Sequence, residues 1–161
     1  MSIHLHFRAV AESEIHDDHT WLAGFMSDAW DVHEEEYAAG ITDSIDKIWG
    51  SVHEFYAAAG TLDTDPGEPW TLPVYGGRPV PDSADADPSD PPMMLLEPPG
   101  VSQAARFLAT VSFDALWDVA GAGFEARGCA RQEFLEHHTS LRGFYGRAAS
   151  AGHAVVKVVW A

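Results

Sequence analysis

A chain of 161 residues can form one domain with a sizeable core but is too short for two. Its 25 acidic residues against 9 basic ones give a net charge of −16, which argues against nucleic acid as a partner because phosphate binding needs a basic face. No apolar run approaches the roughly 20 residues that span a bilayer, and the N-terminus lacks the apolar region of a secretory signal. With a single cysteine, Cys129, the composition predicts a cytoplasmic protein that neither enters a membrane nor forms disulfides.

The acidic residues are concentrated near the start of the chain. Nine of them lie between Ala11 and Glu36, and no Lys or Arg falls in that stretch. One interpretation is a solvated face that keeps the protein soluble. The other is a surface on the first helix that docks a basic protein partner or mimics nucleic acid.

Residues 2–10 alternate apolar and polar side chains, which is the period of a half-buried β-strand. His4 and His6 fall on one side of this strand. Two such histidines could bind a metal ion, but the sequence spacing fixes no third ligand, which favours the interpretation of a polar strand face.

A helix is predicted next, from a cap at Thr20 to about Tyr37, with Gly40 ending it in a left-handed turn. Just before it, residues 16–19 read His-Asp-Asp-His. His16 and His19 are therefore further candidate metal ligands, although acidic residues are also favoured at a helix start by the helix dipole.

A second helix is predicted from Asp43 or Ser44 to Ala59, with Gly60 as its stop. Asp46, Trp49 and His53 would lie at the border of its apolar face, where they could line a pocket or form the rim of the core. Residues seven apart on one helix are separated by about 10 Å, so Asp46 and His53 could not form a catalytic pair by themselves.

All ten prolines lie between Pro66 and Pro99, and proline disfavours both long helices and central strands. The sequence thus predicts an irregular connection over about 62–100, pinned to the domain by two apolar stretches at 70–75 and 93–96. Residues 81–92 are the most polar part and are predicted to be mobile. Gly76 and Gly77 indicate a turn, since no phosphate-loop pattern surrounds them.

Regular structure is predicted to return after residue 100. Ser102 and Ser112 cap two helices, the second ending at 121–123, and a longer helix covers about 130–149. Residues 154–160 form a β-branched run broken only by Lys157, and a run so apolar on both faces is typical of a central strand. The predicted fold class is α+β: a single domain with a small sheet containing both chain ends, covered by four or five helices.

Several of these segments resemble the bacterial YfbM-like family, a domain family of unknown function. The most specific match is Ile45-Asp46-Lys47 followed by Trp49 and His53. Weaker matches are 69–77, which includes Gly76-Gly77, then 96–101 and 145–159. The resemblance spans nearly the whole chain, implies an α+β domain over 1–161, and implies no reaction.

Two classes of function stay open. The first is a non-enzymatic binding or interaction protein that recognises a basic partner or a small ligand near Trp49. The alternative is a small-molecule enzyme with a site near Asp46, Trp49 and His53. No motif in the sequence implies a cofactor or a metal centre. The residues of interest are Asp46, Lys47, Trp49, His53, Gly76 and Gly77.

Overall fold

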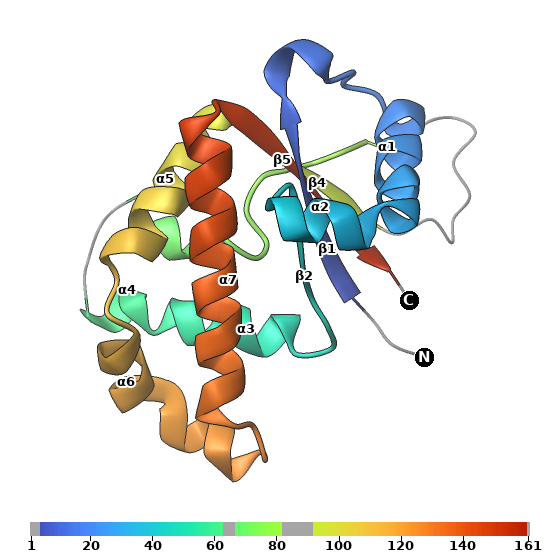
Figure 1. The fold of residues 1–161 in the computed structure, drawn as a ribbon. Helices are drawn as coiled ribbons and strands as arrows, with labels where there is room; N and C mark the ends of the chain where they lie inside the picture. Colours follow the sequence, from blue (N-terminus) through green and yellow to red (C-terminus); the bar gives the residue numbers. More distant parts are fainter. Residues whose placement is uncertain (1–3, 63–66, 82–91, 161) are drawn as a thin grey trace.

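A five-stranded antiparallel sheet forms the centre of the computed structural model, which describes residues 4–62, 67–81 and 92–160. The strand order is β2-β1-β5-β4-β3 (Figure 1). The strands are β1 (His4–Ala11), β2 (Thr42–Ile45), β3 (Arg78–Pro79), β4 (Met93–Leu96) and β5 (His153–Trp160). As predicted, the strands at the two ends of the chain lie in this sheet, and the apolar β5 occupies its middle position between β1 and β4.

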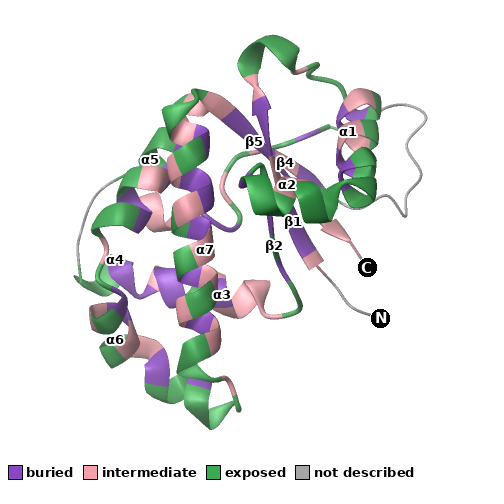
Figure 2. Ribbon diagram, viewed as in Figure 1, coloured by how far each residue is buried: buried purple, intermediate pink, exposed green. Residues whose placement is uncertain are grey.

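Helices cover both faces of the sheet (Figures 1 and 2). One face packs against α1, burying Leu22 and Met26 on Val156 and Val158 of β5. The opposite face carries the larger core, which the long helix α7 crosses. On the first face lie α1 (His19–Asp31) and α2 (His33–Ala39); on the second lie α3 (Trp49–Ala57), α4 (Ala59–Leu62), α5 (Pro98–Thr110), α6 (Phe113–Ala126) and α7 (Arg131–Ser150), with short 3-10 turns at Glu12–Glu14 and Pro69–Thr71.

The first predicted helix is two helices. Val32 departs from helical geometry, with φ −122° and ψ 14°, and separates α1 from α2. The start of α1 is capped by Asp18, whose carboxylate accepts a hydrogen bond from the Trp21 amide at 2.8 Å, and the predicted cap at Thr20 is wrong. The left-handed turn at Gly40 is confirmed, with φ 75°.

The helix predicted from Asp43 to Ala59 is wrong in its first part. Residues 42–45 form the edge strand β2, whose Thr42 and Ile45 pair with Arg8 and Leu5 of β1. β-branched side chains suit such a pairing, and their tertiary partners outweigh the helical spacing seen in the sequence. Helix α3 begins only at Trp49, and Gly60 lies inside α4 instead of ending the helix.

The proline-rich segment is more regular than predicted. The apolar stretch at 93–96 is strand β4, which pairs with β5. The short β3, earlier in the chain, pairs with the other side of β4 and forms the edge of the sheet. An edge strand tolerates Pro79 because its missing N–H costs no interior hydrogen bond. Of the stretch predicted to be mobile, 82–91 lies outside the described residues.

The C-terminal helices agree with the predictions in order but differ at their ends. Pro98 occupies the first turn of α5, so that helix starts four residues before the predicted cap at Ser102. Ser112 does cap α6, accepting from the Ala115 amide at 3.2 Å, but α6 continues past the predicted end at 121–123 to Ala126.

In the described part of the chain, no helix is long and apolar enough to cross a membrane.

A buried lysine ties the proline-rich segment to the sheet. Lys157 of β5 is fully buried, and its Nζ donates to the carbonyl oxygens of Leu72 at 2.6 Å and Pro73 at 3.3 Å. The Tyr145 hydroxyl of α7 donates to the same Pro73 oxygen at 2.7 Å. Burial lowers the pKa of Lys157 well below its usual value.

This burial predicts a pH signature for the Lys157→Met variant. The unfolded lysine binds a proton up to its ordinary pKa near 10.5, whereas the folded one releases it at lower pH. The wild type should therefore gain stability relative to the variant as pH rises from 7 to 9, by at most about 1.4 kcal/mol per pH unit. Urea unfolding at several pH values measures this difference. Lys47→Met, at an exposed position, is the control, and a pH-independent difference for Lys157→Met would contradict the prediction.

Candidate functional site

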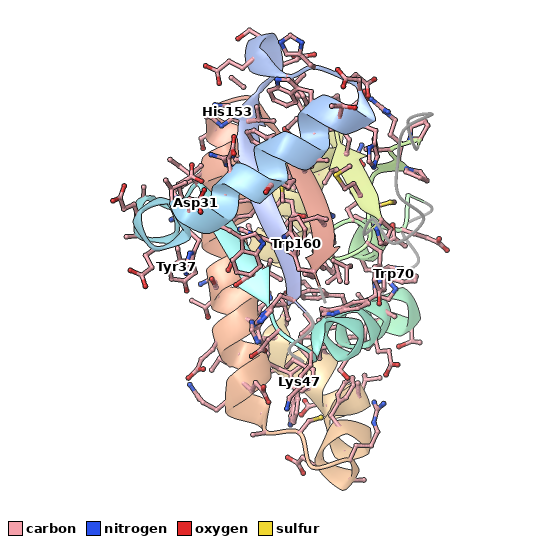
Figure 3. All side chains as sticks on the ribbon, turned by 90° about the vertical axis from the view of Figure 1, so that its right-hand side faces the viewer. Asp31, Tyr37, Lys47, Trp70, His153 and Trp160 are labelled. Carbon is pink, nitrogen blue, oxygen red and sulfur yellow. The ribbon has the colours of Figure 1, made fainter. Side chains whose placement is uncertain are left out.

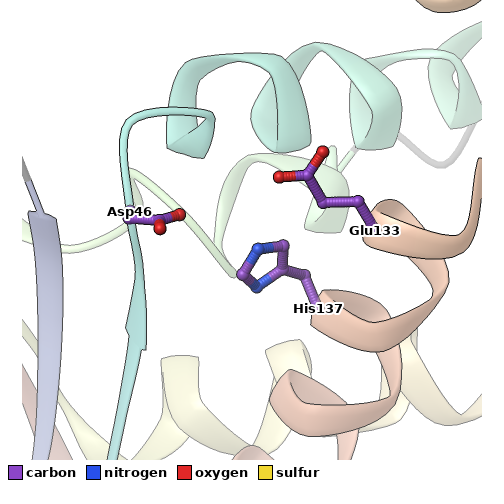
Figure 4. A group of neighbouring side chains, drawn as sticks. All are labelled: Asp46, Glu133 and His137. Atoms are coloured by element: carbon purple, nitrogen blue, oxygen red, sulfur yellow. The ribbon is translucent and has the colours of Figure 1, made fainter. Parts of the chain in front are cut away.

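Three potential metal ligands converge where the turn after β2 meets α7 (Figure 4). Asp46 lies in the turn, and Glu133 and His137 lie one helical turn apart on α7. One ligand atom from each of the three side chains lies within 4.8 Å of the other two. Asp46 is exposed, while Glu133 and His137 are half-buried. Burial lowers the pKa of His137, and the neighbouring carboxylates oppose that shift.

The position of Asp46 depends on contacts between β2 and α7. Asp43 of β2 is buried, and its carboxylate accepts hydrogen bonds from the Ser44 amide at 2.8 Å and from the Ser140 hydroxyl of α7 at 2.9 Å. Nearby, Arg147 of α7 donates to the Gly40 carbonyl at 3.4 Å. Desolvation raises the pKa of Asp43 from 3.8 to about 6, against the lowering effect of these hydrogen bonds and of Arg147.

Trp49 and His53, which were predicted to border the same helix face as Asp46, contact a different part of the molecule. Trp49 and His53 lie on α3, and both rings contact Tyr75, with centroids 5.5 Å and 4.4 Å away. His53 also packs on Trp70 at 5.7 Å. Since Asp46 precedes the helix, the one-helix geometry used for Asp46 and His53 does not apply. Lys47 is exposed in the same turn (Figure 3).

A second candidate site is a cavity of about 370 Å³ between β1, β2 and the α1–α2 corner, here called the α2 pocket. His6 forms part of it, is 4% exposed, and has a buried Nδ1 with no hydrogen-bond partner among the described residues. Burial, aided by the charges of His33, Arg8 and His4, lowers the pKa of His6 to about 4. The pocket is lined by His4, His6, Trp30, His33, Glu34, Tyr37, Thr42, Asp43 and Ser44.

The four histidines predicted as metal candidates do not come together as a metal site. His4 and His6 face Trp30, with ring centroids 6.1 Å and 5.5 Å away, and His16 stacks on Trp21 at 5.2 Å. His19 is buried in the first turn of α1. Within residues 4–62, 67–81 and 92–160, the group of three or more ligands close enough for one ion is Asp46, Glu133 and His137.

Gly76 and Gly77 have a structural reason to be glycine. A Cβ at Gly76 would lie 2.3 Å from the Leu72 Cα, and one at Gly77 would lie 2.8 Å from the Leu95 carbonyl oxygen. Gly77 also has φ 122°, which side chains disfavour. The two glycines thus let the segment held by Lys157 turn closely against β4.

Sequence reasoning missed Glu133, His137 and Asp43. The four-residue spacing of Glu133 and His137 places them on one helical face, which is a usable signal. Their proximity to Asp46 depends on the strand at 42–45, which the sequence presented as helix. Asp43 could not be found because its role comes from burial against Ser140.

The fold and this site define a single-domain α+β protein whose open antiparallel sheet carries helices on both faces. The chain belongs to the family described as a domain of unknown function (DUF1877), whose model matches residues 1–158. The crystal structure of YfbM from Escherichia coli, a protein of unknown function, is similar over 98% of this chain and 99% of that chain, with a TM-score of 0.57. At 13% identity this similarity shows the fold alone. No curated protein is significantly similar to the chain in sequence.

The raised pKa of Asp43 predicts how an Asp43→Asn variant behaves. A carboxyl group with a folded pKa near 6 adds stability that is complete below its ordinary value of 3.8 and is lost as pH rises through 6. The free energy of unfolding of the wild type relative to Asp43→Asn should fall by about 2.4 kcal/mol between pH 4 and pH 7. Arg147, the charged group that acts on Asp43, is unchanged in the variant, as are Tyr56 and Tyr145, whose pKa values the Asp43 charge raises.

Urea unfolding of both proteins across this pH range measures the difference. Asp118→Asn, at an exposed position on α6, is the control and should show no such trend. Parallel stability curves for wild type and Asp43→Asn would show that the carboxyl group titrates in the native protein as it does in the unfolded chain.

Proposed function

We propose that this protein is a non-enzymatic binding domain whose α2 pocket holds a small organic cation. The observation that carries the proposal is the make-up of the pocket wall. It combines exposed aromatic rings with the exposed acid Glu34, and none of the described residues that line it is Lys or Arg. Aromatic faces and carboxylates together attract a cation that also has an apolar body.

The aromatic part of the wall comes from α1 and α2. Trp30 is 39% exposed and Tyr37 is 57% exposed, so both rings are accessible to a ligand. The Trp30 ring is supported by Trp160 at the end of β5, with centroids 6.1 Å apart. A cation over such a ring gains about 0.5–2 kcal/mol, depending on how far it is desolvated.

The charges around the pocket also favour a cation. Glu34 contributes to the wall, and the whole chain carries a net charge of −16. The nearest arginine on β1, Arg8, is engaged by Glu36 at 3.0 Å and lies over the Phe25 ring. Attraction of a cation toward such a surface is screened by salt.

The buried histidine gives the pocket a polar group at its base. With a pKa near 4, His6 is uncharged at neutral pH and does not repel a cation. Its unpartnered Nδ1 can donate or accept a hydrogen bond, depending on its tautomer. A ligand that carries a hydroxyl or amide beside its cationic group would satisfy this atom.

Two sources can supply such a cation: a free small molecule, or a basic side chain of a protein partner. The second corresponds to the predicted basic partner at the acidic first helix, which stays a prediction. Reversing the charge of acids on α2 would test that prediction. Because Glu36 pairs with Arg8, the reversal is best limited to Glu34 and Glu35. The alternative of an enzyme near Asp46, Trp49 and His53 also stays a prediction.

The proposal predicts that choline binds more tightly than its uncharged isostere 3,3-dimethylbutan-1-ol. Binding is followed by NMR through the indole N–H signal of Trp30, with affinity from calorimetry. We expect choline to bind at least about tenfold more tightly than the alcohol, which corresponds to about 1.4 kcal/mol. A lysine-rich peptide and a trimethyllysine peptide, tested in parallel, distinguish a protein partner from a free cation.

Matched variants localise the effect. Trp30→Ala and Glu34→Gln should weaken choline binding, whereas Glu35→Gln, a neighbouring exposed acid outside the pocket wall, should leave it unchanged. Equal affinity for choline and the alcohol would show an apolar pocket without charge selection. Failure of choline and both peptides to bind would refute the proposed function.

A further inference from the structure

The convergence of Asp46, Glu133 and His137 is independent of the α2 pocket, because the two share no residue. We propose that these three side chains form a binding site for a divalent transition-metal ion. The ligands would be one imidazole nitrogen and one oxygen from each carboxylate. The remaining coordination positions would be open to water or to a small ligand.

The separations suit a single ion. In metal sites with bonds of about 2.0–2.2 Å, two ligand atoms lie roughly 3–4 Å apart. The three candidate atoms already lie within 4.8 Å of one another. Small side-chain rotations close the difference, since Figure 4 shows all three side chains directed toward a common space.

Among the described residues, no basic side chain pairs with the carboxylate of Asp46 or Glu133. Within the described part of the chain, no hydrogen bond or salt bridge engages the Asp46 or Glu133 carboxylate or the His137 ring. Nearby acids such as Asp114 and Glu54 are instead paired with arginines, at 2.6 Å and 3.0 Å. Two carboxylates held this close repel each other, and a divalent cation would remove that repulsion.

The donor set selects the kind of metal. Imidazole suits Zn²⁺, Co²⁺ and Ni²⁺ better than Mg²⁺ or Ca²⁺, which prefer oxygen ligands. Two carboxylates and one imidazole leave at least one position free in a tetrahedral site and three in an octahedral site. Such an open site differs from the closed four-ligand sites that serve structure only.

The backbone holds the ligands in place before any ion arrives. Glu133 and His137 belong to the same helix, and the bond between Asp43 and Ser140 joins β2 to that helix three residues before Asp46. The exposed Asp46 carboxylate leaves an access path from solvent. Little ordering is needed on binding, which favours affinity.

The test is calorimetric titration of tag-free, chelator-treated protein with Zn²⁺, Co²⁺ and Mn²⁺, with Mg²⁺ and Ca²⁺ as comparison ions. We expect one Zn²⁺ per chain, and at least about tenfold weaker binding in Asp46→Asn and His137→Gln. Co²⁺ should also give a visible absorption band that these variants lose. Unfolding curves establish that each variant is folded, and Asp46→Asn changes an exposed residue, so it remains informative if His137→Gln does not fold.

Two controls separate this site from other surface ligands. Glu136→Gln changes an exposed acid on the same helix, and His4→Gln changes a histidine of the α2 pocket; both should bind metal like the wild type. Binding that survives in Asp46→Asn and His137→Gln, or that is lost in His4→Gln, would overturn the proposal. Choline binding should be unaffected by Asp46→Asn, so failure of the metal site leaves the proposed function standing.

Discussion

The hydrogen bond between Asp43 and Ser140 joins the two parts of the molecule that meet at the candidate sites. It links the edge strand β2 to the long helix α7, across 97 residues of sequence. An edge strand has a sheet neighbour on one side only, so its position depends on side-chain contacts on the other. Because Asp43 is buried, the carboxylate gives up hydration to make this contact, and the pKa rises accordingly.

Both candidate sites lie beside β2. Thr42 and Ser44 take part in the wall of the α2 pocket, on the face covered by α1 and α2. Asp46 follows the strand directly and reaches the α7 face with Glu133 and His137. A four-residue strand thus separates a pocket rich in aromatic and histidine side chains from a group of carboxylates and imidazole.

The predictable part of the fold depended on local patterns. The apolar run of β5, broken only by Lys157, indicated a central strand, and the periodicity of α7 located that helix within one residue at each end. The pattern failed at 42–45, where pairing with β1 overrides a helical spacing. Of the site, Asp46 was identified by family resemblance, but its partners on α7 depend on a contact distant in sequence. The burial of Lys157 likewise depends on carbonyl partners at Leu72 and Pro73 that no local pattern indicates.

The proposed metal site requires that the β2–α7 contact bring Asp46, Glu133 and His137 together around one ion. Anomalous diffraction at the cobalt absorption edge, from crystals grown with Co²⁺, tests this most directly because it locates the ion itself. We expect one strong anomalous peak within about 2.2 Å of a ligand atom of each of the three residues. A peak beside His4 and His6 would contradict the proposed site. So would the absence of a peak between β2 and α7 in crystals where Co²⁺ fully occupies another position.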